Sequence, residues 1–250
     1  MSTVAGESRA LAWRQLLRAA NVFTAASNVM AGFLVVAGRW APAELMALLI
    51  AASACLYLAG MVLNDVFDAE LDAVERPERP IPSGRISRGT AAAVGWTLLG
   101  VGVALAWAAA WTHGHALPGI IATLLALAIV LYDSKLKATP LGPPAMGCCR
   151  ALNVLLGASA ARDLAGHWPA LGYALGIGLY TMALTAVARS ETVGQWSRRR
   201  YVRSLVTRMI QGFIVIDAIA AGVAAGWPSA LAVLALLVPT WLLERQAPMT

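Results

Sequence analysis

The sequence predicts an all-α, polytopic membrane protein built as a bundle of transmembrane helices. Of its 250 residues, 59% are hydrophobic and only 13% are charged, whereas about 25% of the residues in a typical soluble domain are charged. Mean hydropathy is +0.69. Apolar runs of about 20 residues, long enough to cross a hydrocarbon core of roughly 30 Å, recur along the whole chain. Helices are the expected spanning form because their backbone hydrogen bonds close within each segment.

Turn-forming residues divide the apolar sequence into about eight spans. We place these spans at residues 21–38, 43–64, 90–111, 117–133, 141–160, 168–188, 205–226 and 228–243. The spans at 117–133 and 228–243 are short, so their ends are the least well defined. The length suits one compact bundle, and we expect residues 1–250 to form a single membrane domain.

Lysine and arginine residues gather in alternate loops of this arrangement. With eight spans, almost all of them fall on one side: before the first span, after the second, fourth and sixth spans, and after the eighth. The opposite loops contain only Arg39 and Arg162. The positive-inside rule makes the basic side cytoplasmic. We therefore expect both termini in the cytoplasm, in a multi-pass protein of the cell inner (plasma) membrane. The net charge of +6 is interpreted as topology and not as binding of nucleic acid.

Acidic residues are concentrated in one short segment that begins where the second span ends. Six of the 13 Asp and Glu residues lie within residues 65–78. On a helix, Asp65, Asp68 and Asp72 fall within about 60° of one another. Carboxylates on one face repel each other unless a cation lies among them, and Mg²⁺ commonly bridges a few carboxylates to substrate phosphates. The alternative is a solvated acidic loop, which would not explain why the acids share a face. We predict a Mg²⁺ site.

A stiff basic loop follows directly. The stretch from Glu75 to Arg85 contains three prolines and Gly84, which favour a non-helical path. Arg76, Arg79 and Arg85 offer planar donors suited to phosphate oxygens. By itself this stretch would be an ordinary cytoplasmic loop, but its position after the carboxylates favours a phosphate clamp.

These residues carry a resemblance to a known family. The string NDVFDAELDAVERPERPIPSGRIS resembles the first aspartate-rich motif of the UbiA superfamily of membrane prenyltransferases. The resemblance implies a helical bundle, usually of nine spans, around a central cavity that we expect to open to the cytoplasmic side. It also implies that the membrane-embedded cavity binds a polyprenyl diphosphate through Mg²⁺. By this match Asn64, Asp65, Asp68 and Asp72 take the metal–diphosphate role.

A second element follows the fourth predicted span. Tyr132-Asp133-Ser134-Lys135-Leu136-Lys137 resembles the Tyr-x-x-x-Leu/Met-Lys element of the same family. The resemblance gives Lys135 a phosphate-contacting role, and we expect Asp133 and Lys137 to be substrate-binding residues.

The chain departs from the family pattern after the sixth predicted span. The family has a second aspartate motif there, but residues 180–192 contain no aspartate, and Glu191 is their only acid. A ninth span is also absent from our assignment. We expect Glu191 to act as a metal ligand in place of the missing motif, with Arg189 as a substrate-binding neighbour.

Two charged residues, Arg150 and Asp217, lie near the middle of predicted spans, where a charge is costly and is expected to face the bundle interior. Arg150 lies in the fifth span with Asn153 almost one turn later. The partner of Arg150 could be Asp133, a substrate phosphate or a substrate hydroxyl. The alternative is a buried structural ion pair. The spacing of Leu136-Lys137, Arg150 and Gly157 resembles both the branch that uses polar acceptors such as phosphoribosyl diphosphate and the EboC-like branch. Asp217, in the seventh span, could form a hydrogen bond within the cavity.

The leading functional hypothesis is an enzyme that transfers a prenyl group from a polyprenyl diphosphate to an unidentified acceptor, with Mg²⁺ as cofactor. The residues expected to carry catalysis are Asp65, Asp68, Asp72, Lys135 and Arg150. One alternative is a transporter, for which intramembrane Arg150 and Asp217 would line a pathway. Another is a non-catalytic lipid- or isoprenoid-binding relative that has kept only the first aspartate-rich site.

Overall fold

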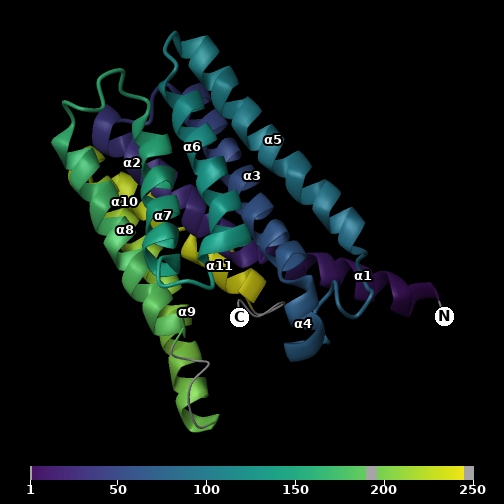
Figure 1. Ribbon diagram of the computed structural model, residues 1–250. Helices are drawn as coiled ribbons and strands as arrows, with labels where there is room; N and C mark the ends of the chain where they lie inside the picture. The colour runs from purple at the N-terminus through teal and green to yellow at the C-terminus, as the bar shows by residue number, and fades with distance from the viewer. Residues whose placement is uncertain (1, 190–195, 245–250) are drawn as a thin grey trace.

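The computed structural model describes the backbone of residues 2–189 and 196–244, and the side chains of residues 10–189 and 205–243. Every regular element in these ranges is a helix (Figure 1). The α-helices are α1 Ser2–Leu17, α2 Val22–Ala37, α3 Ala43–Phe67, α4 Ala69–Glu75, α5 Arg88–His113, α6 Leu117–Leu131, α7 Gly142–Ala158, α8 Trp168–Arg189, α9 Trp196–Ala225, α10 Trp227–Leu234 and α11 Leu237–Glu244. A short 3₁₀ turn, η1 (Ala19–Asn21), precedes α2, and a π-helical turn, η2 (Tyr132–Leu136), extends α6.

The expected all-helical membrane bundle is confirmed. In the described ranges, six helices are long and apolar enough to cross a membrane: Ala19–Ala37, Ala43–Phe67, Arg88–His113, Leu117–Leu136, Trp168–Arg189 and Leu205–Ala225. The span expected at 141–160 is the 17-residue helix α7. The span expected at 228–243 is two short helices, α10 and α11. Pro239 explains this break, because its ring lacks an N–H and clashes with the carbonyl four residues earlier. The count of eight spans and the cytoplasmic side of the cavity stay predictions.

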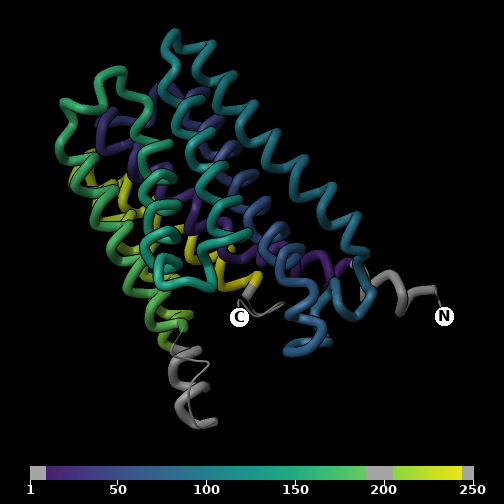
Figure 2. Tube along the Cα trace, viewed as in Figure 1, coloured from purple at the N-terminus to yellow at the C-terminus, as the bar shows by residue number. Residues whose placement is uncertain are grey.

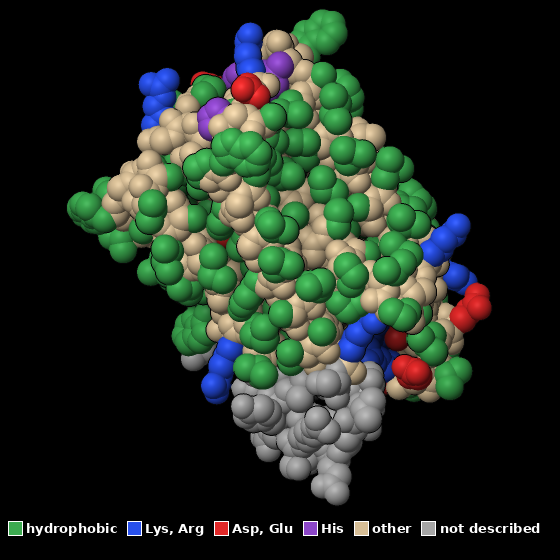
Figure 3. All heavy atoms as spheres, turned by 60° about the vertical axis from the view of Figure 1, so that its left-hand side comes forward, with side chains coloured by type: hydrophobic (Ala, Val, Ile, Leu, Met, Phe, Trp, Pro, Cys, Tyr) green, Lys and Arg blue, Asp and Glu red, His purple; other side chains and the backbone are tan. Residues whose placement is uncertain are grey.

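The outer surface of the bundle is suited to lipid. Large apolar side chains project outward from α5, α6, α8 and α9; examples are Trp107, Leu124, Leu127, Leu175, Ile219 and Val223. In Figure 3, hydrophobic side chains cover the middle of the face shown, and charged side chains gather toward its ends. An apolar belt with polar ends is the surface expected of a membrane-spanning protein.

The main core lies between α2, α3, α6, α7 and α9, and a close contact between α2 and α7 organises it. A methyl group added at Gly32 would collide with the carbonyl oxygen of Val154, and one added at Gly157 would collide with that of Val29. Small residues at such reciprocal positions let two helix backbones approach closely, as is common inside membranes. This contact fixes the relative positions of the polar side chains on α2 and α7.

A second apolar cluster lies at one end of the bundle. Helix α1 extends from this end of the bundle (Figures 1 and 2), and Ala69 of α4 belongs to the same cluster as α1. Ala12 and Leu16 of α1 pack with Val62 and Val66 of α3 and with residues that flank the basic loop. Ile81 and Ile86 are the loop residues in this cluster, and both are buried. The cluster therefore holds the basic loop against α1 and the end of α3.

Candidate functional site

The three aspartates predicted to share a helix face lie where α3 gives way to α4. Helix α3 ends at Phe67, and Asp68 forms the junction with α4. The continuous helix expected here is therefore interrupted at one residue, but the backbone N–H of Asp68 still donates to Asn64 and that of Asp72 to Asp68. Asp65 and Asp72 are buried, with 5% and 4% of their surface exposed, and Asp68 is half-buried.

Basic side chains neutralise these carboxylates. Arg79 Nη1 lies 2.7 Å from Asp72 Oδ2 and 3.5 Å from Asp65 Oδ1. Arg18 Nη2 lies 3.2 Å from the same Asp65 oxygen. Asp65 and Asp72 thus converge on a single guanidinium nitrogen, which places their oxygens close together in a shielded position. Of the three arginines proposed as a phosphate clamp, Arg79 is the one that reaches the aspartates.

Arg18 is a site residue that the sequence reasoning missed. It is the described non-glycine residue with a positive φ, 44°, at the entry to η1. Left-handed backbone costs free energy for a residue with a side chain, and such strain gathers at functional sites. Here it ends α1 and turns the Arg18 side chain toward Asp65 and Met61. The available signal was an arginine directly before the first span.

The element after α6 completes the site through Lys137. Lys137 Nζ lies 2.6 Å from Asp68 Oδ1 and donates to the Asn64 carbonyl at 3.4 Å. Asn64 Nδ2 donates to Asp133 Oδ1 at 2.9 Å. Asp133 and Lys137 share a face because they are four residues apart, whereas Lys135 lies about 200° from Asp133 on a helix. The π-helical turn contains Asp133 and ends immediately before Lys137, and such turns are frequent at functional sites.

Other predicted residues lie away from this cluster. Lys135 and Arg76 are exposed, and neither side chain forms a hydrogen bond or ion pair with a described residue. Arg85 donates to Gln15, to Ser83 and to the Glu78 carbonyl.

Helix α8 reaches the segment that carries Lys137 through Arg189, its last residue. Arg189 donates to the carbonyls of Thr139 and Lys137, so it holds the turn before α7. Glu191, the proposed replacement metal ligand, lies outside the described residues.

Arg150 has partners that the sequence did not indicate. Its Nη1 donates to Asn28 Oδ1 at 3.0 Å and its Nη2 to Thr24 Oγ1 at 2.9 Å. Its guanidinium carbon also lies 4.6 Å from the ring centre of Phe213 and 5.9 Å from that of Tyr57, a cation–π arrangement. Asp133, the candidate partner from the sequence, pairs with Asn64 instead because it lies at the α6 end.

The other polar residues of the spans form cross-bundle hydrogen bonds. Asn28 Nδ2 donates to both oxygens of Asp217 at 2.9 Å, and Ser27 and Tyr173 also donate to this carboxylate. Asn153 donates to the Ala25 carbonyl and accepts from Ser53. Asp217 is therefore hydrogen-bonded through both oxygens, and Asn28 joins it to Arg150 through hydrogen bonds.

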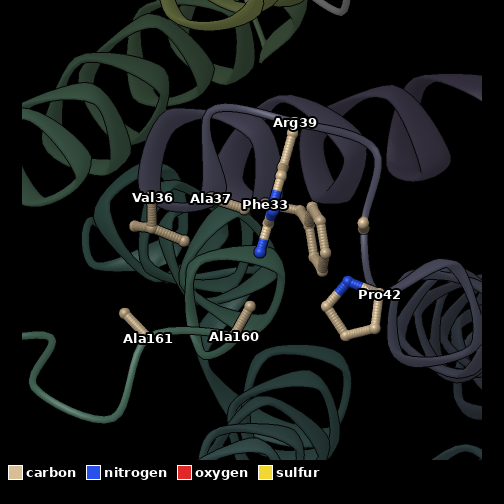
Figure 4. Close-up of a pocket in the computed structure, with 8 residues that line it drawn as sticks. Phe33, Val36, Ala37, Arg39, Pro42, Ala160 and Ala161 are labelled. Atoms are coloured by element: carbon tan, nitrogen blue, oxygen red, sulfur yellow. The ribbon is translucent and has the colours of Figure 1, made fainter.

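The opposite end of α2 carries a separate hollow of about 190 Å³. Figure 4 shows Arg39 extending into it beside Phe33, with Pro42 and Ala160 nearby. No carboxylate lines this hollow. Beyond it, burial and the neighbouring Arg162 lower the pKa of His115. The residues that line this hollow therefore offer no carboxylate ligand for a metal ion.

The aspartate cluster has a donor set that fits a bridging magnesium ion. Within the described part of the chain, no group of three or more His, Cys, Asp or Glu residues is compact enough to enclose a metal. Mg²⁺ does not need such a cage, since it usually takes one or two carboxylates and completes its shell with water and substrate phosphates. Asp65 and Asp72, buried and directed at one point, supply that number of oxygens.

The fold and the cluster define a polytopic helical membrane protein with paired acids and bases at one end of its bundle. The UbiA prenyltransferase family profile matches residues 25–247. The chain belongs to the UbiA prenyltransferase family.

Curated relatives are digeranylgeranylglyceryl phosphate synthases. The chain is 39% identical over 132 residues to that of Methanopyrus kandleri, a match that covers 52% of this chain and 45% of the relative. It is 32% identical over 157 residues to that of Metallosphaera sedula, which covers 62% of this chain and 52% of the relative. The match therefore spans about half the length of these relatives.

Two solved structures share the fold. One is of a digeranylgeranylglyceryl phosphate synthase, with a TM-score of 0.59, 19% identity, and coverage of 95% of this chain and 85% of that one. The other is a UbiA homolog from Archaeoglobus fulgidus, with a TM-score of 0.51, 15% identity, and coverage of 95% and 89%. At these identities the likeness concerns the fold alone.

Proposed function

We propose that this protein transfers a prenyl group from a polyprenyl diphosphate to an acceptor within the membrane. The observation that carries the proposal is the convergence of Asp65 and Asp72 on Arg79, beside the Asp68–Lys137 pair. Acids and bases alternate there at the end of an apolar bundle. A magnesium diphosphate complex offers both the cation that the acids would bind and the anion that the bases would bind.

Each residue has a role that follows from its charge and position. Asp65, Asp68 and Asp72 would hold Mg²⁺, which neutralises charge on the departing diphosphate when it is bound. Arg18, Arg79 and Lys137 would turn from the carboxylates to the phosphate oxygens and stabilise the negative charge that grows as the C–O bond breaks. Asn64 holds the two helix ends together through Asp133. The apolar interior would exclude water from the allylic cation.

The topology and the acceptor belong to the same proposal. The site lies at the end of the bundle that also carries Arg79, Arg85, Arg88, Lys135 and Lys137, so the positive-inside rule supports a cytoplasmic site and cytoplasmic termini in the inner membrane. The names of the relatives favour a glyceryl phosphate carrying one prenyl chain as the acceptor.

A transfer assay tests the proposal. Purified protein in detergent is given geranylgeranyl diphosphate, geranylgeranylglyceryl phosphate and Mg²⁺, and both released diphosphate and prenylated product are quantified. We expect both to form with Mg²⁺ and neither with EDTA. Asp68→Asn is the inactive comparison, and Glu70→Gln is its control, because exposed Glu70 pairs with Arg88 on the surface. Equal release of diphosphate by wild type and Asp68→Asn would refute the proposal.

A further inference from the structure

One buried oxygen atom in the bundle has no partner. The side chain of Asn21, with 7% of its surface exposed, carries an Oδ1 atom that accepts no hydrogen bond from any described residue. Buried polar atoms are almost always hydrogen-bonded, so an exception calls for an explanation such as a missing ligand.

Asn21 lies in a group of polar side chains from three helices. Its side chain is a neighbour of the Tyr57 hydroxyl on α3. Its carbonyl accepts from Thr24 Oγ1 at 2.7 Å, and the same Thr24 oxygen accepts from Arg150 of α7 at 2.9 Å. Asn21 is therefore linked to Arg150 through Thr24, and the Arg150 guanidinium in turn lies over the Tyr57 ring.

Arg150 has donors left over for a ligand. Its two hydrogen bonds go to uncharged oxygens, and it forms no ion pair with a described residue. Arginine has further N–H groups beyond these two. Arg150 and Tyr57 lie deep in the bundle, yet both remain partly accessible. Side chains that lie deep in the bundle and are still partly accessible are expected to face a space inside it.

This group lies directly inward of the aspartate cluster. Tyr57 precedes Asn64 by 7 residues and Asp68 by 11, which places each of the two within about 20° of Tyr57 around the helix axis. The rise per residue puts Tyr57 about 10 Å deeper than Asn64. Arg18, which bonds Asp65, precedes Asn21 by three residues. A group held by Asn21 and Tyr57 would therefore meet the first carbon of a prenyl diphosphate whose phosphates occupy the aspartate cluster.

We infer that Asn21, Tyr57 and Arg150 bind a hydroxyl-bearing acceptor, an inference that rests on the proposed function. The reacting hydroxyl donates its hydrogen bond to Asn21 Oδ1, and a second acceptor oxygen receives a hydrogen bond from Arg150. The hydroxyl oxygen forms a bond to the first prenyl carbon as the bond from that carbon to the diphosphate oxygen breaks. The departing diphosphate takes the hydroxyl proton. The product is an ether.

The test compares two probes, geranylgeranylglyceryl phosphate and its analogue with hydrogen in place of the free hydroxyl. Calorimetry in detergent measures both dissociation constants without prenyl donor, for wild type, Asn21→Leu and Tyr57→Phe. Tyr180→Phe is the matched control, because that half-buried hydroxyl bonds only the Met209 carbonyl. The affinity of each variant for geranylgeranyl diphosphate with Mg²⁺ is measured in parallel.

Wild type should bind the hydroxyl probe at least tenfold tighter than the deoxy probe, and Asn21→Leu should abolish that difference. Tyr57→Phe should weaken the hydroxyl probe severalfold, and Tyr180→Phe should change nothing. Donor affinity should stay within twofold in every variant. If Asn21→Leu still discriminates between the probes, or if wild type does not, the inference is wrong. If the wild-type protein does not bind geranylgeranyl diphosphate with Mg²⁺, the proposed function is wrong instead.

Discussion

The Lys137 ammonium nitrogen lies 2.6 Å from Oδ1 of Asp68 and joins the end of α6 to the junction of α3 and α4. Lys137 also donates to the carbonyl of Asn64, the first residue of the aspartate motif. The segment after α6 is thereby tied to the motif through one side chain. The same ammonium group is placed to pass from the carboxylate to a phosphate oxygen.

Replacing Lys137 should weaken diphosphate binding, whereas replacing Lys135 should not. Lys137→Ala removes a cation from the cluster, and we expect a loss of at least tenfold in affinity for geranylgeranyl diphosphate with Mg²⁺, about 1.4 kcal/mol. Lys135→Ala removes an exposed charge from the same segment and should change the affinity less than twofold. Calorimetry measures the affinity of both variants and shows which lysine contacts the diphosphate. If Lys135→Ala loses more affinity than Lys137→Ala, Lys135 is the residue that contacts the phosphate, as the resemblance to the family implied.

Arg79 should be the important arginine of the basic loop. Arg79→Ala leaves the buried Asp72 carboxylate without its partner, and breaking a buried pair costs about 3–5 kcal/mol, so this variant should unfold at a clearly lower temperature. Arg79→Lys keeps a charge and should fold, but it should bind diphosphate at least tenfold more weakly because lysine lacks the planar fork. Arg76→Ala, at an exposed position, is the control. Equal affinities for Arg79→Lys and wild type would contradict this assignment.

The contact between α2 and α7 should tolerate no added methyl group. Gly157→Ala places a side chain against the Val29 carbonyl, and overpacking of this kind typically costs about 1–3 kcal/mol. Gly100→Ala on α5 meets no atom within 4 Å and should leave the melting temperature unchanged or slightly higher. Thermal melts in detergent provide the measurement. Equal melting temperatures for the two variants would show that α2 and α7 do not pack as described.

The two ends of the bundle should lie on opposite sides of the membrane. In a background with Cys55, Cys148 and Cys149 replaced, single cysteines at Ala116 and Ala138, both exposed, should react with an impermeant maleimide from opposite sides. The Ala138 site should be reached from the cytoplasmic side, because the basic residues gather there. Labelling of both sites from one side would overturn this topology.

The composition and the spacing of apolar runs were enough to predict the helical bundle, because in lipid the backbone has few other ways to satisfy its hydrogen bonds. The break between α10 and α11 was missed because the apolar run continues across it, although Pro239 was a visible signal for it. The aspartate cluster was also predictable, because its members are close in sequence and share one helix face.

The partners of the cluster were harder to predict. Arg18 reaches Asp65 across 47 positions of sequence, and this contact depends on how α1 packs against the bundle. Lys137 could have been preferred to Lys135, because helical spacing places it beside Asp133. The network of Arg150 depends on the close approach of α2 and α7, which spacing along one helix does not reveal.

The most direct test of the central claim is the affinity of the protein for geranylgeranyl diphosphate with and without Mg²⁺. If Asp65 and Asp68, together with Asp72, hold the ion that bridges to the phosphates, Mg²⁺ should tighten wild-type binding at least tenfold. Asp65→Asn and Asp68→Asn should each lose that gain while their melting temperatures show a folded bundle. Binding that responds to Mg²⁺ in both variants as it does in wild type would contradict the account.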